Sequence, residues 1–385
     1  MQVGETIYLD YQAATPVDER VARVMQNASA SLFANPHAAD HALGWRAFSA
    51  IQGAADEVGK LFGLQGDDVV FTSGASEANA MALRAAITIS QQKGRDEILV
   101  GAADHGSVLN EAISSGLTVS QIALDVSGAP DPAHLKGLLT DQTALVTVIG
   151  VNNENGAISD LEAISDICQT AGTLLHVDLS QSALATDIDL FDLEIGLATV
   201  SAHKLYGPKG VGALLVNPGI AEISSPLIVG AGQQSGRRGG TMPTELICGF
   251  GEACRLVGDL KDIDRQRVAA IRDGFVDLFE QQQIAALVGD RENRHPGNAL
   301  MRFQGCDASD LLARVQPQIA ASTQSACSSG SIKPSHVLQA MGFDHVTASE
   351  CVRFSFGRFS TECQSRTAFE VLAKVVLELR SGTVE

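Results

Sequence analysis

The sequence lacks the segments that mark membrane-spanning and secreted proteins. No apolar run reaches the roughly 18 residues that a membrane-spanning helix needs. Residues 1–6 carry neither the basic stretch nor the apolar stretch of a secretory signal peptide. Positive charge is also scarce, with 27 lysine and arginine residues against 45 aspartate and glutamate residues. The resulting net charge of −18 argues against a nucleic-acid-binding surface, and we expect a cytoplasmic protein.

The cysteines exclude two further classes of protein. There are seven, an odd number, and no two of them form a Cys-x-x-Cys pair. A disulfide framework and a zinc site are therefore not indicated, no metal is expected, and a reducing compartment is favoured. Apolar residues make up 45% of the chain and charged residues 19%, which is ordinary for a soluble globular enzyme.

Short apolar segments alternate with helical patterns through the first part of the chain. We expect strands at 69–71, 97–100, 144–149 and 174–177, with helices at 77–89, 107–114 and 161–170. This alternation predicts a large, mostly parallel sheet with helices on both faces, an α/β fold. In such sheets ligands bind beyond the carboxyl ends of the strands. Polar clusters fall there, at 72–76, 104–105, 152–154, 178–181 and 201–204.

The pattern changes after residue 251. Long helices expected at 262–282 and 366–380 flank short strands at 298–303 and 352–356. A length of 385 residues favours about two to three domains. We predict a large domain over residues 16–254 and a smaller α/β domain made of residues 1–15 and 255–385. In this division the N-terminal strand, 6–9, joins the smaller domain, and a helix follows Pro16.

Lys204 lies where an apolar run, 195–200, ends, and a Gly-Pro turn then leads into a second apolar run, 213–216. A lysine at the mouth of a buried strand loses water, and this lowers its pKa. The neutral amine can attack a carbonyl and form a Schiff base. Ser201 and His203 precede it and can point to the same site. A surface lysine at the start of a hairpin fits this pattern equally well.

Three other residues stand out by position. Asp178 ends a buried strand, and a buried carboxylate needs a partner. Ser76 lies where a helix begins, which suits either a phosphate or an ordinary helix cap. Cys327 lies among small polar residues, 322–331, which indicates an exposed loop. The other cysteines lie mainly in apolar or helical contexts, so Cys327 is the candidate nucleophile.

Residues 201–210 resemble the lysine motif of the cysteine desulfurases of the NifS/IscS type, which are class V aminotransferase-like enzymes that use pyridoxal phosphate (PLP). The resemblance covers nearly the whole chain, including the segments 10–16 and 34–41 and the glycine-rich loop 230–243. It implies the PLP-dependent transferase fold of type I, with the large sheet domain binding PLP and the smaller domain carrying Cys327 and Arg353.

The resemblance also implies roles for individual residues. Lys204 would carry PLP as a Schiff base, and Asp178 would keep its ring nitrogen protonated. His105 would stack on the ring and act as acid or base. Arg353 would bind the substrate carboxylate through its planar fork. The remaining PLP-binding positions implied are Ala75, Ser76, Asn153, Gln181, Ser201, His203 and Thr241, with Asn153 also at the substrate.

Simpler interpretations remain for several of these residues. His105 also fits an ordinary loop histidine, and Asn153 and Gln181 fit ordinary loop hydrogen bonding. Arg353 also fits a cross-strand ion pair.

The implied reaction converts L-cysteine to L-alanine. Lys204 would remove the α-proton, and Cys327 would take the sulfur as a persulfide and pass it to an acceptor protein, for iron–sulfur cluster assembly or another thiolation. A thiol of ordinary pKa is only a few per cent thiolate at pH 7, so His105 or another group must help to deprotonate it. The family's threonine binds the phosphate of the neighbouring subunit, so a homodimer with Thr241 acting across the interface is implied.

The chain departs from the family pattern in several places. Gln324 replaces a glycine before Cys327, which predicts a stiffer loop. Residues 233–235 differ from the usual sequence, which leaves the salt bridges of the glycine-rich loop open. Asp104 stands where the family has glutamate. The chain ends soon after its last expected helix, so we expect the family's scaffold-docking tail to be absent.

Two other functions fit parts of the sequence. One is a selenocysteine lyase or another class V PLP lyase or aminotransferase, against which Cys327 in its small-residue loop argues. The other is a non-catalytic scaffold of a sulfur-transfer system, against which Lys204, Asp178 and Arg353 argue.

Overall fold

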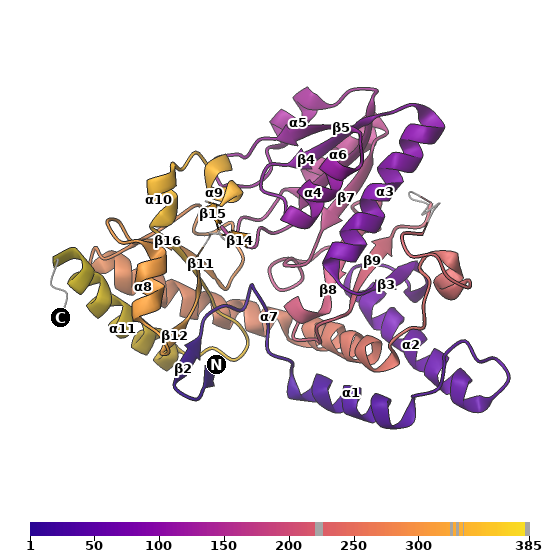
Figure 1. Cartoon of the computed structure of the whole chain (residues 1–385), viewed down its shortest axis with the longest axis horizontal. Helices are drawn as coiled ribbons and strands as arrows, with labels where there is room; N and C mark the ends of the chain where they lie inside the picture. Colours follow the sequence, from indigo (N-terminus) through magenta and orange to yellow (C-terminus); the bar gives the residue numbers. More distant parts are fainter. Residues whose placement is uncertain (220–225, 324–325, 329–330, 334, 382–385) are drawn as a thin grey trace.

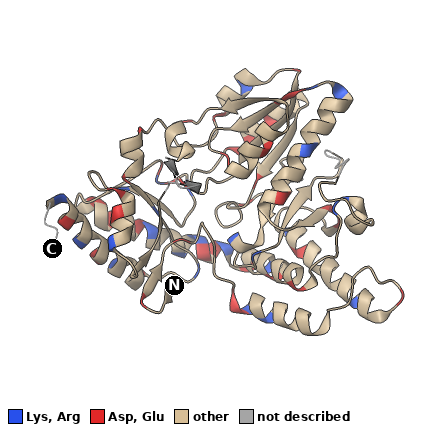
Figure 2. Cartoon of the chain, viewed as in Figure 1, with Lys and Arg blue, Asp and Glu red and all other residues tan. Residues whose placement is uncertain are grey.

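The computed structural model describes residues 1–219, 226–323 and 335–381, together with the backbone of two short strands at 326–328 and 331–333. Figure 1 shows a large sheet flanked by helices, a smaller sheet beside it, and a long helix that runs beneath both. No helix within the described ranges is long and apolar enough to cross a membrane. Figure 2 shows acidic and basic residues interleaved along the helices α7 and α11, whose bounds follow.

The large sheet has seven strands in the order β3-β9-β8-β7-β6-β4-β5. The strands from β8 to β5 are parallel, and β9 runs antiparallel between β3 and β8. Most of their residues are buried, as expected for a sheet covered on both faces. The strands are β3 Val69–Thr72, β4 Glu97–Gly101, β5 Thr118–Ile122, β6 Thr143–Ile149, β7 Leu174–Asp178, β8 Leu197–Ser201 and β9 Gly212–Val216.

Helices cover both faces of this sheet, which confirms the predicted fold class. On one face α3 and α4 pack on Val70, Ile98 and Val100. On the other, α2, α5, α6 and the first part of α7 pack around Leu99 and Val146. The helices of this part are α1 Glu19–Ser31, α2 Ala42–Leu61, α3 Ala75–Lys93, α4 Gly106–Ser114, α5 Pro132–Leu138 and α6 Leu161–Ala171, with 3-10 turns η1 Gly66–Asp68, η2 Ala202–Lys204 and η3 Gln233–Gly236.

The smaller sheet has the antiparallel order β10-β11-β16-β13. Helices α7, α8 and α11 pack on it around a cluster of aromatic rings that includes Phe275, Phe279 and Phe354. The elements are β10 Ala286–Leu287, β11 Asn298–Arg302, α8 Ala308–Arg314, β13 Ser322–Thr323, β14 Ala326–Ser328, β15 Ser331–Lys333, α9 His336–Ala340, α10 His345–Ser349, β16 Cys351–Ser355 and α11 Glu362–Ser381.

The N-terminal segment packs with this second cluster rather than with the large sheet. Strands β1 Gln2–Val3 and β2 Thr6–Tyr8 form a three-stranded sheet with β12 Ile319–Ala320. Ile7 and Leu9 belong to the same hydrophobic cluster as the aromatic rings. The first helix begins later than the sequence suggested, at Glu19, because the Asp18 carboxylate accepts a hydrogen bond from the Arg20 N–H and caps it.

Helix α7, Thr244–Gln281, is one continuous helix of 38 residues, whereas we expected a helix only from residue 262. Its first half joins the cluster under the large sheet and its second half joins the aromatic cluster (Figure 1). Three glycines, at 249, 251 and 258, weakened the helical pattern in the sequence. Gly251 is required by packing, because a Cβ there would lie 2.6 Å from the Cα of Ala54. The helix crosses the predicted boundary at 254/255, and the division into two domains stays a prediction.

Candidate active site

A cavity of about 620 Å³ opens at the carboxyl ends of β6, β7 and β8, between the large sheet and strand β16. Ten of the residues proposed from the sequence line it: Ala75, Ser76, His105, Asn153, Asp178, Gln181, Ser201, His203, Lys204 and Arg353. They come from segments far apart in the chain, so the sheet brings them together. Thr241 does not line the cavity. The side chain of Cys327 and all of Gln324 lie outside the described residues.

Lys204 ends the 3-10 turn that follows β8. Its Nζ donates hydrogen bonds to two backbone oxygens, at 2.6 Å to Gln12 and 2.8 Å to Ala13. Burial, together with the smaller effect of the nearby charge of Arg353, lowers the pKa of Lys204 to about 8. Lys204 therefore lies inside the cavity and not on a surface hairpin. A sizeable fraction of its amine is neutral near pH 8 and can act as a nucleophile.

Asp178 is the last residue of β7 and is only 4% exposed. One carboxylate oxygen accepts from the Asn79 side chain at 3.0 Å, and the other accepts from the Ser180 N–H at 3.0 Å. No lysine or arginine in the described ranges forms an ion pair with it. This buried carboxylate therefore has room for a cationic partner from within the cavity.

Asn79 is a functional candidate that the sequence analysis missed. It is fully buried in the second turn of α3, and its amide bridges Asp178 and the Ser107 hydroxyl at 3.0 Å each. The signal was an asparagine on the apolar face of an expected helix. A polar side chain there needs a buried partner, and only the packed structure shows that the partner is Asp178.

His105 caps the N-terminus of α4. Its Nδ1 accepts the Ser107 N–H at 3.1 Å and lies 2.8 Å from the Ser107 hydroxyl. The side chain is exposed to the cavity, and desolvation there lowers the pKa of His105, which favours the neutral ring; because Nδ1 accepts from Ser107, Nε2 carries the proton in that form. The preceding Asp104 does not line the cavity: it is fully buried and accepts from the backbone N–H groups of Gly101 and Ile149, at 3.1 and 2.7 Å.

The end of the cavity beside the N-terminus of α3 suits an anion. Gly74 caps this helix with φ +151, ψ −179, a conformation that favours glycine. The turn packs tightly on β9, since a Cβ on Gly212 would lie 2.8 Å from the Cα of Gly74. Ser201 and His203 lie opposite, with Oγ and Nδ1 2.9 Å apart. Ser76 is the second residue of this helix, whose first N–H groups attract negative charge.

Arg353 enters from β16, the strand of the smaller sheet. Its Nη1 donates to the Asn153 backbone oxygen at 2.7 Å, and its Nη2 lies 2.6 Å from the Asp10 carboxylate. The ion-pair interpretation therefore describes a real contact: Asp10 lies just beyond the end of β2, where its backbone forms a bridge with Ser355 of β16. Arg353 lines the cavity at the same time. Gln181, on the opposite wall, donates to the Gln12 backbone oxygen at 2.8 Å.

The glycine-rich loop lies along β3, the edge strand of the large sheet (Figure 1). The Gln234 side chain accepts from the Phe71 N–H at 2.7 Å and donates to the Phe71 oxygen at 2.9 Å, as a neighbouring strand would. Arg238 forms an ion pair with Glu77 at 2.8 Å. Gln234, one of the residues that depart from the family pattern, thus binds the edge of the sheet. The loop keeps a salt bridge through Arg238. Thr241 is exposed beside it.

The cysteines divide as follows. Five are buried: Cys168, Cys248, Cys254, Cys306 and Cys351. Burial raises the pKa of Cys351 to about 12, which makes its thiol inert. Cys363 is exposed on helix α11, so burial holds for most of the other cysteines but not for this one. Cys327 lies in β14, whose backbone pairs with β15 as a short hairpin.

Other lining residues were not proposed from the sequence, chiefly Gln12, Ser107, Ser180 and Lys209. The hydroxyl of Ser180 is buried and has no hydrogen-bond partner among the described residues. Gln12 comes from the N-terminal segment, and only the packing of that segment on β16 brings it to the cavity.

The model of the family described as Aminotransferase class-V matches residues 7–364. The chain belongs to this family. It is 36% identical over 378 residues to a cysteine desulfurase IscS of Rickettsia bellii (strain OSU 85-389), an alignment that covers 97% of this chain and 92% of that protein.

Solved structures agree with this assignment. A NifS-like protein superposes with a TM-score of 0.90 at 27% identity, covering 97% of this chain and 99% of that one. A structure described as SspA in complex with cysteine has a TM-score of 0.80 at 30% identity and covers 92% of this chain and 100% of that one. Together the likenesses support a PLP-dependent cysteine desulfurase of the NifS/IscS type, as the sequence motifs implied.

The residues present fit PLP. A buried carboxylate without a cationic partner, Asp178, suits a protonated ring nitrogen. The N-terminus of α3, with Ser76, Ser201 and His203, suits the phosphate. Lys204, whose pKa is lowered, suits the aldehyde, and His105 lines the same cavity.

Proposed function

We propose that this cavity holds PLP and L-cysteine and that Cys327 accepts the sulfur. The observation that carries the proposal is the presence, in one cavity, of a lysine of lowered pKa, a buried carboxylate and an arginine: Lys204, Asp178 and Arg353. The first two suit the cofactor, and the third suits the carboxylate of an amino acid. The finer role of each lining residue rests on this chemistry together with the family resemblance.

Within the proposal, each part of PLP has a partner. Asp178 takes the ring nitrogen, held in place by Asn79 and Ser180. His105 faces the ring, while Asn153 and Gln181 lie at the phenolic oxygen. Ala75, Ser76, Ser201 and His203 take the phosphate. When bound, PLP supplies an electron sink for negative charge at the substrate Cα.

The chain's own groups then handle protons and substrate. Arg353 holds the substrate carboxylate, with Asn153 beside it through the hydrogen bond between them. The Lys204 amine, near neutral, accepts the α-proton. The neutral His105 is a base that can take the proton of a thiol.

Cys327 is proposed as the sulfur acceptor. Its thiolate attacks the substrate sulfur, an S–S bond forms as the Cβ–S bond breaks, and Cβ takes a proton to leave L-alanine. The persulfide then transfers its outer sulfur to an acceptor protein, for iron–sulfur cluster assembly or another thiolation. The chemical reason for choosing Cys327 is that five other thiols are buried, and Cys363 lies on α11, whose residues do not line the cavity.

We also propose a cytoplasmic homodimer in which Thr241 contacts the phosphate of the neighbouring subunit. Thr241 is exposed and does not line its own cavity. Nearby lies a groove of about 290 Å³ lined by Phe48, Phe71 and Met242 among others. Phe33, Trp45 and Phe48 are 75%, 58% and 44% exposed, an apolar surface that a second copy would cover.

A mass measurement tests the sulfur acceptor. The wild-type protein given L-cysteine without reductant should gain one sulfur atom on the peptide that carries Cys327. Cys327→Ser should still bind PLP and L-cysteine but release alanine slowly, because serine accepts no sulfur. Cys363→Ser, the exposed cysteine on α11, serves as the matched control and should behave as wild type. If the added sulfur appears on another cysteine, or if Cys327→Ser turns over normally, the selenocysteine-lyase alternative becomes the better one.

A further inference from the structure

The segment Asp10–Ala13 contacts two of the cationic side chains that line the cavity, Lys204 and Arg353. The Asp10 carboxylate lies 2.6 Å from Arg353 Nη2. Two and three residues beyond Asp10, the backbone oxygens of Gln12 and Ala13 accept the hydrogen bonds of Lys204 Nζ. None of these three residues was a candidate from the sequence, and Asp10 is the only charged one among them.

Backbone contacts fix the position of this segment. The Ser355 N–H donates to the Leu9 oxygen at 2.7 Å, and the Ser355 hydroxyl accepts from the Gln12 N–H at 2.9 Å. Asp10 lies between these two contacts and forms a bridge with Ser355. Ser355 is two residues beyond Arg353 on the same strand. The Asp10 carboxylate and the Arg353 guanidinium are therefore both positioned by the backbone of β16.

The Arg353 guanidinium is held at two of its three nitrogens. Nη1 donates to the Asn153 backbone oxygen and Nη2 donates to the Asp10 carboxylate. Nε is buried and has no hydrogen-bond partner among the described residues. Asp10 contacts Nη2 from the side of the N-terminal segment, and Arg353 lines the cavity at the same time. The guanidinium is thus held by the protein where it borders the space for a substrate.

We propose that Asp10 is a positioning residue for Arg353. It fixes the plane of the guanidinium where Arg353 lines the cavity, so that this plane is already aligned for the substrate's α-carboxylate, and it does so without touching the substrate. A planar fork binds a carboxylate well only when its plane is already aligned, because ordering it during binding costs conformational entropy. The inference rests on the proposed function, in which Arg353 binds that carboxylate.

The test is a titration of the PLP-loaded protein with L-cysteine and with cysteamine, which is cysteine without its carboxylate. The absorbance of the bound cofactor reports the binding of either amine. For Asp10→Ala we expect the apparent Kd for L-cysteine to rise by about tenfold or more, with cysteamine binding unchanged. Asp10→Asn keeps an acceptor oxygen for Nη2 and should stay within about twofold of wild type. In an Arg353→Ala background, Asp10→Ala should add nothing.

Glu350→Gln is the matched control. Glu350 pairs with Arg302 at 2.7 Å, beside the start of β16 and away from the cavity, and its loss should leave both titrations unchanged. If Asp10→Ala does not fold, Asp10→Glu replaces it: the longer side chain should displace the guanidinium and give the same rise.

The outcomes separate the two proposals. An unchanged Kd for L-cysteine in Asp10→Ala overturns the inference. A lower Kd in both Asp10→Ala and Asp10→Asn also overturns it, because Asp10 would then compete with the substrate carboxylate for Arg353. An equal loss for cysteamine also overturns it, because the effect would not pass through the carboxylate. If wild-type protein shows no response to L-cysteine at all, the proposed function fails instead.

Discussion

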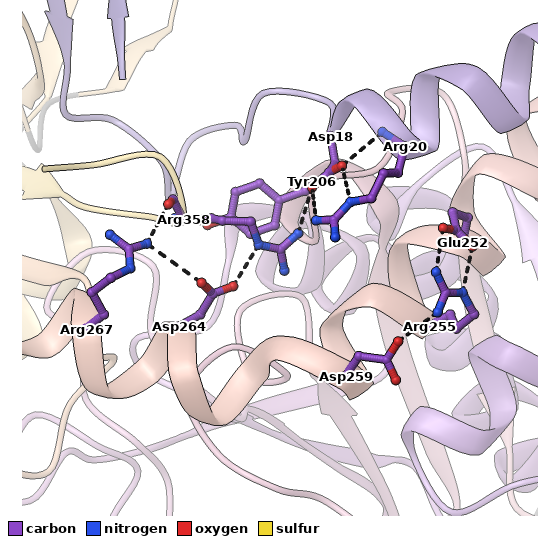
Figure 3. A network of polar contacts seen from close by, with 9 residues as sticks. All are labelled: Asp18, Arg20, Tyr206, Glu252, Arg255, Asp259, Asp264, Arg267 and Arg358. Atoms are coloured by element: carbon purple, nitrogen blue, oxygen red, sulfur yellow. Dashed lines mark hydrogen bonds and ion pairs between the residues drawn. The ribbon is translucent and has the colours of Figure 1, made fainter.

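The Arg358 guanidinium lies over the ring of Tyr206, with 4.3 Å between its central carbon and the ring centroid (Figure 3). The same guanidinium contacts Asp18 at 3.1 Å and Asp264 at 2.7 Å. The Tyr206 hydroxyl also accepts a hydrogen bond from the backbone N–H of Arg358, at 2.6 Å. Tyr206 is two residues beyond Lys204, Asp18 caps α1, and Asp264 lies on α7. Arg358, on the segment after β16, therefore connects the turn that carries Lys204 with the start of α1 and with α7.

Arg358→Ala should lower stability strongly. The Arg358 and Asp18 side chains are only 7% and 4% exposed, and removing one partner of such a pair costs about 3–5 kcal/mol. Arg255→Ala is the control: this arginine, also drawn in Figure 3, pairs with Glu252 and Asp259 but is 42% exposed, so its loss should cost less than about 1 kcal/mol. Thermal unfolding of the cofactor-free proteins measures both. Equal falls in unfolding temperature would contradict the ranking.

The pH dependence of PLP uptake should report the Lys204 amine. Its pKa is lowered to about 8, so the neutral, nucleophilic fraction grows as pH rises through 8. The rate at which cofactor-free protein gains the colour of bound PLP should rise with a midpoint near that pH. The charge of Arg353 contributes to lowering this pKa, so Arg353→Gln should move the midpoint to higher pH. A midpoint near 10.5, the ordinary value for lysine, would contradict burial as the cause.

Trp45→Glu should shift the protein from dimer to monomer. The side chain is 58% exposed on α2, beside the exposed Phe48, and a charge placed in an apolar contact is costly to bury. Sedimentation at micromolar concentration measures the change. Phe191→Glu is the control, because Phe191 is similarly exposed, at 61%, but lies on the segment between β7 and β8. A monomeric wild-type protein, or equal effects of the two changes, would place the interface elsewhere.

The regular part of the architecture could be predicted from the sequence. The strands β3, β4, β6 and β7 and the helices α3, α4 and α6 fall within a few residues of their predicted positions, whereas β5 and α5 were not predicted. Periodicity and apolar runs are local signals, and here packing agrees with them. Helix α7 was predicted only in part, because its glycines are tolerated through contacts such as that of Gly251 with Ala54, which no local pattern shows.

The residues of the candidate site also fall into two groups, those that the sequence could predict and those that only the structure reveals. Lys204, Asp178 and His105 lie at or just beyond the ends of strands, and a parallel sheet brings such strand ends to one edge, so their shared cavity could be anticipated from sequence and family resemblance. Only the tertiary structure reveals Asn79 on Asp178 and Asp10 on Arg353. These pairs are 99 and 343 residues apart in the chain. The packing of whole elements sets such contacts, and no local pattern encodes the partner of a buried polar group.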